Sequence, residues 1–425
     1  MNNTNNLEPA NAFIANPGSG QERHPRHLSF LFHARLWIFC AICFVLPMRA
    51  SFIYLGSALL LIVWVAEGQL MQKISKIFRS KLCIACIIYF LAFFIAMLWT
   101  ENRQTGWQMV GSQRPFLLFL LFWSSSESEY KERYVTAFLA GLCVCAVLAY
   151  YNLLQLHWFP EWPRGIRVLK NPSDTAPFVD WIMYAPMLAL GAYLSLRRAL
   201  FVKIISERIA YSFIAGLILL NLAFSGGRAG MIMFVVLLVM LVFERIKARG
   251  KAALLCAVIL PLFFLTAYSA IHSFAARVDA GISDIRTFSD DPNTSVGQRM
   301  VYWTTTFRLF LQHPVLGVGS GDLQTEYAKI KPEQWAMTPD SYNPHNQYLM
   351  TAATTGLLGL TGLFFVFYAA AAGSDMRTKS FLVGFAVLCL FESYLWRSNT
   401  TLAFSVMLAF LTKKETEGRF INRTS

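Results

Sequence analysis

Apolar residues along this chain fall into long blocks separated by short polar connections, and they do not form a two-faced helical stripe. A block of this kind can cross the ~30 Å hydrocarbon core of a bilayer as one helix. The second and eighth blocks are short, so tilted helices or local thinning of the bilayer are expected there. We therefore predict an all-α polytopic membrane protein with about twelve transmembrane helices, near residues 34–48, 51–66, 82–99, 106–123, 134–154, 179–196, 209–224, 229–244, 252–271, 356–373, 380–395 and 400–412.

One long polar segment, residues 272–355, interrupts this pattern between the ninth and tenth predicted spans. Its content of Trp, Tyr and Phe is too high for a disordered linker. A long ordered loop in a membrane protein is a common location of function. We expect the chain to divide into residues 1–271, with an N-terminal tail and nine spans, the partly helical loop 272–355, and residues 356–425, with three spans and a C-terminal tail.

The loop contains a clear signal for the start of a helix. The pattern Ser295-x-x-Gln298 is a capping box, in which two side chains satisfy free backbone N–H groups, so a helix should begin near Val296. The pair His313-Pro314 should end it, because the residue before a proline avoids the helical conformation. Apolar residues recur between these limits at helical spacing, which predicts that one face of the helix packs on the bundle or the membrane surface.

A second helix is expected to begin at His345, because Asn343-Pro344 is typical of an N-cap followed by a first turn. This helix should run toward Gly356, where the tenth span follows. The partial positive charge of a helix N-terminus disfavours an imidazolium, so the ring of His345 should stay neutral near pH 7 and be able to accept a proton from a hydroxyl group. The alternative is a structural histidine bonded to the side chain of Asn343 or Asn346.

Charge gives the expected orientation. Only 14% of the 425 residues are charged, against about 25% in soluble domains. The net charge of +13 does not predict a nucleic-acid partner, because the basic residues lie in short connections between apolar blocks. Twelve spans place all of these clusters on the side of the N-terminus, which the positive-inside rule makes cytoplasmic. The clusters are Lys73, Lys76, Arg79 and Lys81; Arg197, Arg198, Lys203 and Arg208; Arg245, Lys247, Arg249 and Lys251; and Lys413, Lys414, Arg419 and Arg423.

Both termini should therefore lie in the cytoplasm and the loop 272–355 outside, which in a Gram-negative bacterium means an inner-membrane protein with a periplasmic loop. The first 27 or so residues are polar, with Arg23 and Arg26 before the first apolar block. No cleavage site of small residues follows, so an uncleaved first span with a cytoplasmic tail is expected.

Several kinds of chemistry find no support in the sequence. All eight cysteines lie in apolar blocks, so they predict neither a disulfide framework nor a zinc site. Metal-binding and nucleotide-binding motifs are missing, and the adjacent pair Asp290-Asp291 is a weak signal for a divalent cation. We expect no metal and no cofactor. Energy should then come from an activated substrate or from a gradient.

Two arginines share with His345 a predicted place near the start of a helix on the outer side. Arg228 follows Ser225-Gly226-Gly227 and opens the eighth span, and Arg299 follows the capping box. Free N–H groups, the helix dipole and a guanidinium fork together favour phosphate. Gly226 and Gly227 would let the backbone approach an anion closely. The alternatives are an interfacial anchor for Arg228, and for Arg299 an ion pair with Asp290 or Asp291.

Arg114 lies within the fourth predicted span, directly before Pro115. An arginine at membrane depth is costly, so it should face the bundle interior or a wet cavity, and the proline predicts a kink or break of the helix. Glu392 and Arg397, at the outer end of the eleventh span, form either a structural ion pair or part of a functional site. Gln298, Asn346 and Arg397 complete the set of residues expected to contact substrate.

Together these fragments resemble the O-antigen ligase and O-antigen polymerase superfamily, and the resemblance covers roughly residues 215–400. Each fragment is weak alone, but their order along the chain is fairly specific. The N-terminal half agrees only in hydropathy. The fragments are Ser225-Gly226-Gly227-Arg228-Ala229; Ser295-x-Gly297-x-Arg299-x-x-x-Trp303; His313-Pro314-x-x-Gly317-x-Gly319; and His345-Asn346-x-Tyr348-Leu349 with Gly356-Leu357-Leu358-Gly359.

The resemblance implies a GT-C-like inner-membrane glycosyltransferase whose donor is a glycan on undecaprenyl pyrophosphate. A ligase of this superfamily transfers the glycan to a sugar hydroxyl of lipid A–core without a metal or nucleotide. By residue, the resemblance implies that Arg228 and Arg299 bind the diphosphate and that His345 is the general base. An O-antigen polymerase, a protein O-oligosaccharyltransferase and a lipid or glycan transporter remain alternatives, although a transporter should show internal repeats, which we do not find.

Overall fold

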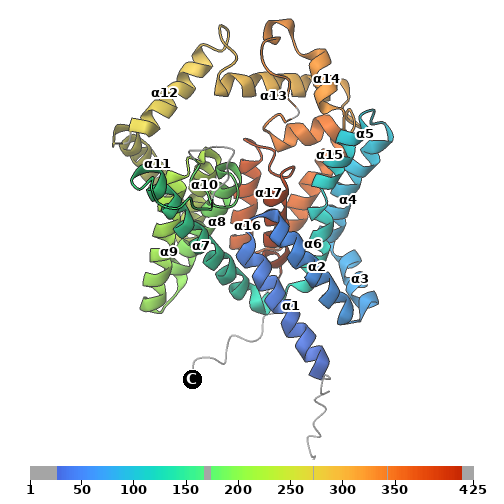
Figure 1. Cartoon of the computed structure of the whole chain (residues 1–425), viewed down its shortest axis with the longest axis vertical. Helices are drawn as coiled ribbons and strands as arrows, with labels where there is room; N and C mark the ends of the chain where they lie inside the picture. The colour runs from blue at the N-terminus through green and yellow to red at the C-terminus, as the bar shows by residue number, and fades with distance from the viewer. Residues whose placement is uncertain (1–25, 167–173, 271, 342, 414–425) are drawn as a thin grey trace, which may run out of the picture.

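The computed structural model describes residues 26–166, 174–270, 272–341 and 343–413, and these residues contain helices but no strand (Figure 1). The tail with Arg23 and the segment after Lys413 lie outside the described residues. The helices are α1 (Arg26–Val45), α2 (Ala50–Ala66), α3 (Leu70–Arg79), α4 (Lys81–Ile95), η1 (Ala96–Leu98), α5 (Arg103–Ser112), α6 (Pro115–Ser125), η2 (Ser128–Tyr130), α7 (Lys131–His157), α8 (Trp181–Phe201), α9 (Ile205–Phe224), α10 (Arg228–Arg245), α11 (Arg249–Ala270), α12 (His272–Arg286), α13 (Ser295–Gln312), α14 (Leu323–Ile330), η3 (Glu333–Trp335), α15 (Gln347–Ala371), α16 (Met376–Leu388) and α17 (Ser398–Leu411).

Each of the twelve predicted spans overlaps a helix; the fourth overlaps the pair α5 and α6, and the eleventh is helical only as far as Leu388. By length and composition, 5 of the described helices can cross a membrane, or up to 6 if the bent pair of α2 and α3 counts as one span. The other predicted spans coincide with helices that are too short or too polar to qualify on these grounds. The chain is a helical membrane protein, and the number of its spans stays a prediction.

The outer faces of several helices carry large apolar side chains that no part of the described chain covers. Examples are Ile62 on α2, Phe213 on α9 and Leu262 on α11, which are 64%, 72% and 61% exposed. The opposite faces pack into a core that includes the fully buried Tyr89, Phe119 and Phe138. A helix surface of this kind is stable against lipid and costly in water, which supports a membrane environment.

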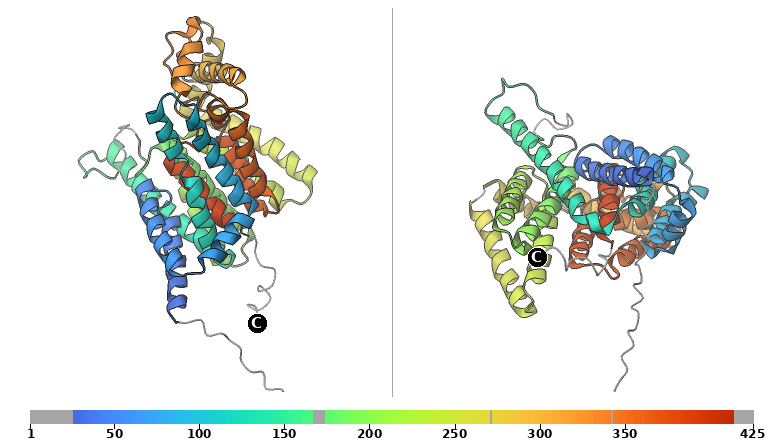
Figure 2. Two further views of the ribbon diagram at one scale, coloured as in Figure 1. Left: turned by 90° about the vertical axis from the view of Figure 1, so that its right-hand side faces the viewer. Right: turned by 90° about the horizontal axis from the view of Figure 1, so that it is seen from below.

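The basic clusters gather at one end of the bundle, which we call the basic end. This end holds α3, the start of α7 and the end of α17 (Figures 1 and 2). Arg198 Nη2 lies 2.6 Å from Glu132 Oε2 at the start of α7, and Arg245 stacks on Phe201, which follows Arg197 and Arg198 by a few residues. Lys73 and Lys413 line one pocket there. The expectation that these clusters share one side is therefore met as far as the described residues reach.

At the other end, α12, α13 and α14 form a layer beyond the ends of the bundle helices (Figures 1 and 2). Helix α13 begins at Ser295, close to the predicted start. Its N-cap is Thr294, whose Oγ1 accepts a hydrogen bond from Gly297 N at 3.1 Å, so the expectation that Ser295 caps the helix is wrong by one residue. Helix α13 ends before His313, as the sequence predicts.

Helix α15 begins two residues later than predicted. The side chain of Asn346 caps it by accepting from Leu349 N at 3.0 Å, and His345 has φ 51°, a left-handed conformation that excludes it from the helix. The expected first turn at His345 is therefore wrong, because Asn346 supplies the cap in place of Asn343. The predicted junction at Gly356 is confirmed, since Gly356 (φ 63°, ψ −157°) interrupts α15 with a kink.

The segment after α13 holds this kink in place. Gly317 and Gly319 have φ 70° and 112°, which lets the chain turn tightly against α15. Val318 N then donates to Ala353 O at 2.9 Å, and Leu357 N donates to Pro314 O at 2.8 Å. The pattern His313-Pro314-x-x-Gly317-x-Gly319 therefore satisfies backbone groups that the kink in α15 leaves free.

Candidate active site

His345 lies where three elements meet at the end of the bundle opposite the basic end. Its backbone N donates to Asn343 Oδ1 at 3.0 Å, which fixes the turn that precedes α15. Its ring stacks on Tyr302 of α13, with the ring centroids 6.1 Å apart and an interplanar angle of 22°. The side chain is 31% exposed, so the imidazole packs against Tyr302 and still remains partly accessible to solvent.

Glu392, in the connection between α16 and α17, is the partner of this imidazole. His345 Nδ1 lies 2.8 Å from Glu392 Oε2, and the carboxylate side chain is only 5% exposed. Asn343 Nδ2 donates to Glu392 Oε1 at 2.8 Å, and Arg397 Nη2 lies 3.4 Å from Oε2. We call these residues the His345 cluster: Tyr302, Asn343, His345, Glu392 and Arg397.

The electrostatics of the cluster keep Glu392 ionised. Burial of the carboxyl opposes ionisation, but the hydrogen bond to His345 and the charge of Arg397 outweigh it and lower the pKa of Glu392 to about 2. An ionised carboxylate can only accept hydrogen bonds. His345 Nδ1 must therefore carry the hydrogen, which leaves Nε2 of the neutral ring as a hydrogen-bond acceptor.

The structure gives a different physical reason from the sequence for expecting His345 to act as a base. The sequence argument relied on a helix N-terminus, but His345 precedes α15. The structure supplies a buried carboxylate that orients the ring and would stabilise its protonated form. The alternative in which the ring of His345 bonds an asparagine side chain is not observed, since Asn343 bonds only its backbone N. For Glu392 and Arg397 the sequence left two alternatives, a structural ion pair or a part in a functional site. The ion pair forms, and because it belongs to the His345 cluster it is compatible with both.

Arg299 lies one residue further into α13 than expected, since the helix begins at Ser295, and it precedes by about one turn Tyr302, whose ring stacks on His345. Among the described residues it forms no ion pair, so the alternative pairing with Asp290 or Asp291 is wrong.

Arg228 is the first residue of α10, as predicted, and its side chain is exposed. Gly384, near the end of α16, packs against Met233 and Leu237 of α10, which places Arg228 at the same end of the bundle as the connection 389–397. In the described part of the chain, Arg228 forms no hydrogen bond or ion pair with the His345 cluster. The structure thus places Arg228 at the same end of the bundle as His345, but without a contact between the two residues.

The two glycines before Arg228 have local structural reasons. Gly226 has φ 70°, so it allows the sharp reversal between α9 and α10. A Cβ on Gly227 would lie 2.1 Å from the Cβ of Ala185 in α8, so Gly227 permits close packing of these helices. The first residues of α8 also accept a bond from the connection 389–397, where Tyr394 donates to Ile182 O at 3.2 Å.

Three other predicted site residues have defined places. Arg114 lies at the break between α5 and α6, so the predicted break is confirmed. Its side chain is exposed and Nε donates to Gly111 O at 2.8 Å, so the expectation that it faces the bundle interior is wrong, while the alternative of a wet cavity stays a prediction. Gln298 donates to Asn293 O at 3.1 Å. Asn346 uses both ends of its amide within the protein, on Leu349 N and Leu390 O.

Sequence reasoning missed the pairing of His345 with Glu392 and the contact with Tyr302. Forty-seven residues separate His345 and Glu392 in the chain, so no local spacing connects them. The only available signal was a carboxylate at the outer end of a predicted span, where an acid is costly unless it has a partner. No group of three or more His, Cys, Asp or Glu side chains that could hold a metal occurs among the described residues.

These features define a membrane protein with a histidine–carboxylate pair and nearby arginines at one end of a helical bundle. Residues 213–365 match the family model described as O-antigen ligase. The match includes Arg228, Arg299 and His345, and it confirms the resemblance over this segment. It implies a glycosyltransferase-like enzyme of O-antigen biosynthesis. A search of curated proteins finds no match.

Proposed function

We propose that this protein is an O-antigen ligase that transfers a glycan from undecaprenyl pyrophosphate to a sugar hydroxyl of lipid A–core, in lipopolysaccharide biosynthesis. The observation that carries the proposal is the pair of His345 and Glu392, because it provides a base for a hydroxyl without a metal. The family match over residues 213–365 supports the class of reaction.

In the proposed reaction His345 Nε2 takes the proton of the acceptor hydroxyl. The oxygen forms a bond to the anomeric carbon of the donor as the bond from that carbon to the diphosphate breaks, with inversion of configuration. The bonding electrons leave with undecaprenyl diphosphate. Glu392 stabilises the imidazolium that forms, as the acid does in a Ser-His-Asp triad. A positioned base of this kind contributes about 10²–10⁴-fold to the rate.

The two arginines would hold the leaving group. A guanidinium presents two parallel N–H groups to a phosphate, and positive charge at the leaving diphosphate lowers the barrier to its departure. Arg299 is the better supported of the two, because it lies on α13 about one turn before Tyr302, which stacks on His345. Arg228 would complete the diphosphate site from the start of α10 once a substrate lies between the elements. The transfer would need neither a metal nor a nucleotide.

We further propose that all twelve predicted spans cross the inner membrane in a GT-C-like arrangement. The basic end would face the cytoplasm with both termini, because cytoplasmic connections are enriched in Lys and Arg. The His345 cluster and the loop 272–355 would then face the periplasm. The gathering of the basic clusters at the end opposite His345 supports this orientation.

Reconstitution of the purified protein with lipid-linked glycan and two acceptors would test the proposed reaction. Glycan on lipid A–core is the expected product. Lengthened lipid-linked glycan would show a polymerase, and glycan on a protein acceptor would show an O-oligosaccharyltransferase. Movement of the lipid-linked glycan across liposomes without transfer to any acceptor would show a transporter and contradict an enzymatic function.

A further inference from the structure

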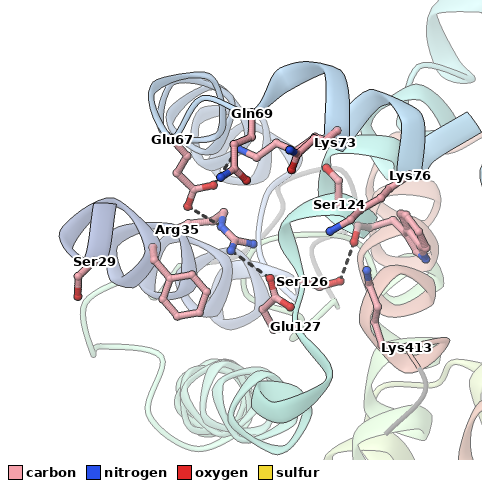
Figure 3. A pocket seen from close by; sticks show the side chains of 13 residues that line it. Ser29, Arg35, Glu67, Gln69, Lys73, Lys76, Ser124, Ser126, Glu127 and Lys413 are labelled. Atoms are coloured by element: carbon pink, nitrogen blue, oxygen red, sulfur yellow. Dashed lines mark hydrogen bonds and ion pairs between the residues drawn. The ribbon is translucent and has the colours of Figure 1, made fainter. Parts of the chain in front are cut away.

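A pocket at the basic end has no part in the proposed reaction. It lies between α1, the junction of α2 and α3, the end of α6 and the end of α17, and its volume is about 520 Å³ (Figure 3). This volume is typical of a small-molecule site. Four basic and two acidic side chains line it, so two positive charges are in excess: Arg35, Lys73, Lys76 and Lys413 against Glu67 and Glu127.

The acidic side chains are already used by two of the cations. Glu67 binds Arg35 Nε at 2.7 Å and Lys73 Nζ at 2.9 Å, and Arg35 Nη2 also reaches Glu127 at 3.0 Å. Within the described ranges, the ammonium groups of Lys76 and Lys413 form no hydrogen bond or ion pair. Both side chains extend into the pocket (Figure 3), so its two excess charges lie together.

Lys413 is held in an environment that disfavours its charge. A cation–π contact with Trp123, whose ring centroid lies 3.8 Å from Lys413 Nζ, favours the charge, but burial outweighs it. Burial lowers its pKa to about 8, and the charges of Arg35 and Lys76 add to this effect while Glu127 opposes it. A bound anion would reverse the repulsion and replace the hydration that the ammonium group has lost.

The pocket opens beside a helix that is suited to the membrane surface. Helix α3 is bent by 117° from α2. On one face of α3 the apolar side chains of Met71 and Phe78 are 79% and 61% exposed. Its basic residues Lys73 and Lys76 lie toward the pocket. An amphipathic helix with this division lies in the membrane interface, with its apolar face among acyl chains and its polar face at the level of the headgroups.

We propose that this pocket binds the phosphate-bearing headgroup of an anionic phospholipid from the leaflet at the basic end. Lys76 and Lys413 bind the phosphodiester, and the amides of Gln69 and Gln72, which also line the pocket, donate to headgroup oxygens. The exposed apolar face of α3 holds the acyl chains, which favours a lipid over a free phosphate. The site is independent of the glycan transfer proposed above.

The test uses the full-length protein in a neutral detergent and follows its thermal unfolding. Dioctanoyl phosphatidylglycerol is expected to raise the melting temperature saturably, because a ligand of the folded state stabilises it by mass action. The variant K76Q/K413Q should need at least about tenfold more lipid for the same shift. The control K203Q/K251Q removes the same charge from exposed positions outside the pocket, one in the connection before α9 and one in the first turn of α11, and should respond like the wild type.

Three results would overturn the proposal: an equal response of K76Q/K413Q and the wild type, an equal response to dioctanoyl phosphatidylcholine, or the full shift with inorganic phosphate alone. The last would show a site for a free anion. The variant K76R/K413R keeps both charges and should retain the response, so it keeps the test decisive if the double glutamine variant does not fold. Loss of the response in this arginine variant would also contradict a phosphate site.

Discussion

At the scale of single residues, the chemistry of His345 is decided by a carboxylate that lies far away in the sequence. Glu392 is buried, and its two carboxylate oxygens bond His345 Nδ1 and Asn343 Nδ2. Its ionised state assigns the hydrogen of the imidazole to Nδ1. The free Nε2 is thus a consequence of the connection 389–397, which positions the acid.

Replacing Glu392 with glutamine should therefore impair catalysis more than substrate binding. The amide has nearly the shape of the carboxylate, but it cannot stabilise the imidazolium. We expect kcat to fall by about 10²-fold or more, while KM for the lipid-linked donor changes little. Initial rates at varied donor concentration measure both quantities. A large rise in KM with unchanged kcat would show that Glu392 serves binding instead.

The same carboxylate should make stability depend on pH. The pKa of Glu392 is about 2 in the folded protein, below its ordinary value of 4.5. Its ionised form therefore contributes on the order of 3 kcal/mol above pH 5, and this contribution is lost as the pH falls from about 4.5 toward 2. Thermal unfolding at pH 6.5 and pH 3.5 should show a larger drop in melting temperature for the wild type than for Glu392→Gln. Equal drops would contradict the shifted pKa.

At the scale of elements, the kink in α15 connects the outer layer to the bundle. Gly356 redirects the helix, so that residues 347–355 run beneath α13 while the remainder enters the bundle. A Cβ at this position would lie 2.2 Å from Val315 O, and φ is positive. Both constraints require glycine, and both act at the junction that holds the start of α15 and hence His345 in place.

Gly356→Ala should therefore destabilise the protein by about 1–3 kcal/mol and reduce transfer, although residue 356 has no role in the chemistry. Gly281→Ala is a matched control, because nothing lies within 4 Å of its added Cβ. Melting temperature and transfer rate, measured on both variants, distinguish the two positions. A Gly356→Ala protein as stable as the control would refute the importance of the kink.

The sequence predicted the helical segments well, because their apolar blocks are long and uniform. It also predicted the break before Pro115 and the junction at Gly356, since proline and glycine act on the backbone locally. It misplaced the caps at Thr294 and Asn346, because neighbouring Ser, Thr and Asn residues compete for the same role. The sequence could not predict the pair of His345 and Glu392, because this contact depends on how α15 and α16 pack.

At the scale of the whole molecule, the two ends of the bundle differ in chemistry. One end carries the basic clusters and their ion pairs, such as Lys131 with Asp375, and the other carries the His345 cluster. Helix α17 separates them, since Arg397 precedes it and Lys413 follows it.

This polarity predicts which loops are accessible from outside the cell membrane. In a variant that lacks the eight native cysteines, Ser289→Cys in the loop 272–355 should react with a membrane-impermeant maleimide in intact spheroplasts. Lys203→Cys, in the connection between α8 and α9, should react only after the membrane is made permeable. Both positions are exposed, so burial does not decide the result. The reverse pattern would place the His345 cluster in the cytoplasm.

The most direct test of the account is the rate of glycan transfer by His345→Ala, measured on purified protein with lipid-linked donor and lipid A–core. We expect a loss of about 10²–10⁴-fold at a temperature where the variant is still folded, since removal of His345 also takes a partner from the buried Glu392 and lowers the melting temperature. His313→Ala, an exposed histidine at the end of α13, should transfer at nearly the wild-type rate. Transfer by His345→Ala at the same rate as the His313→Ala control would show that His345 is not the base.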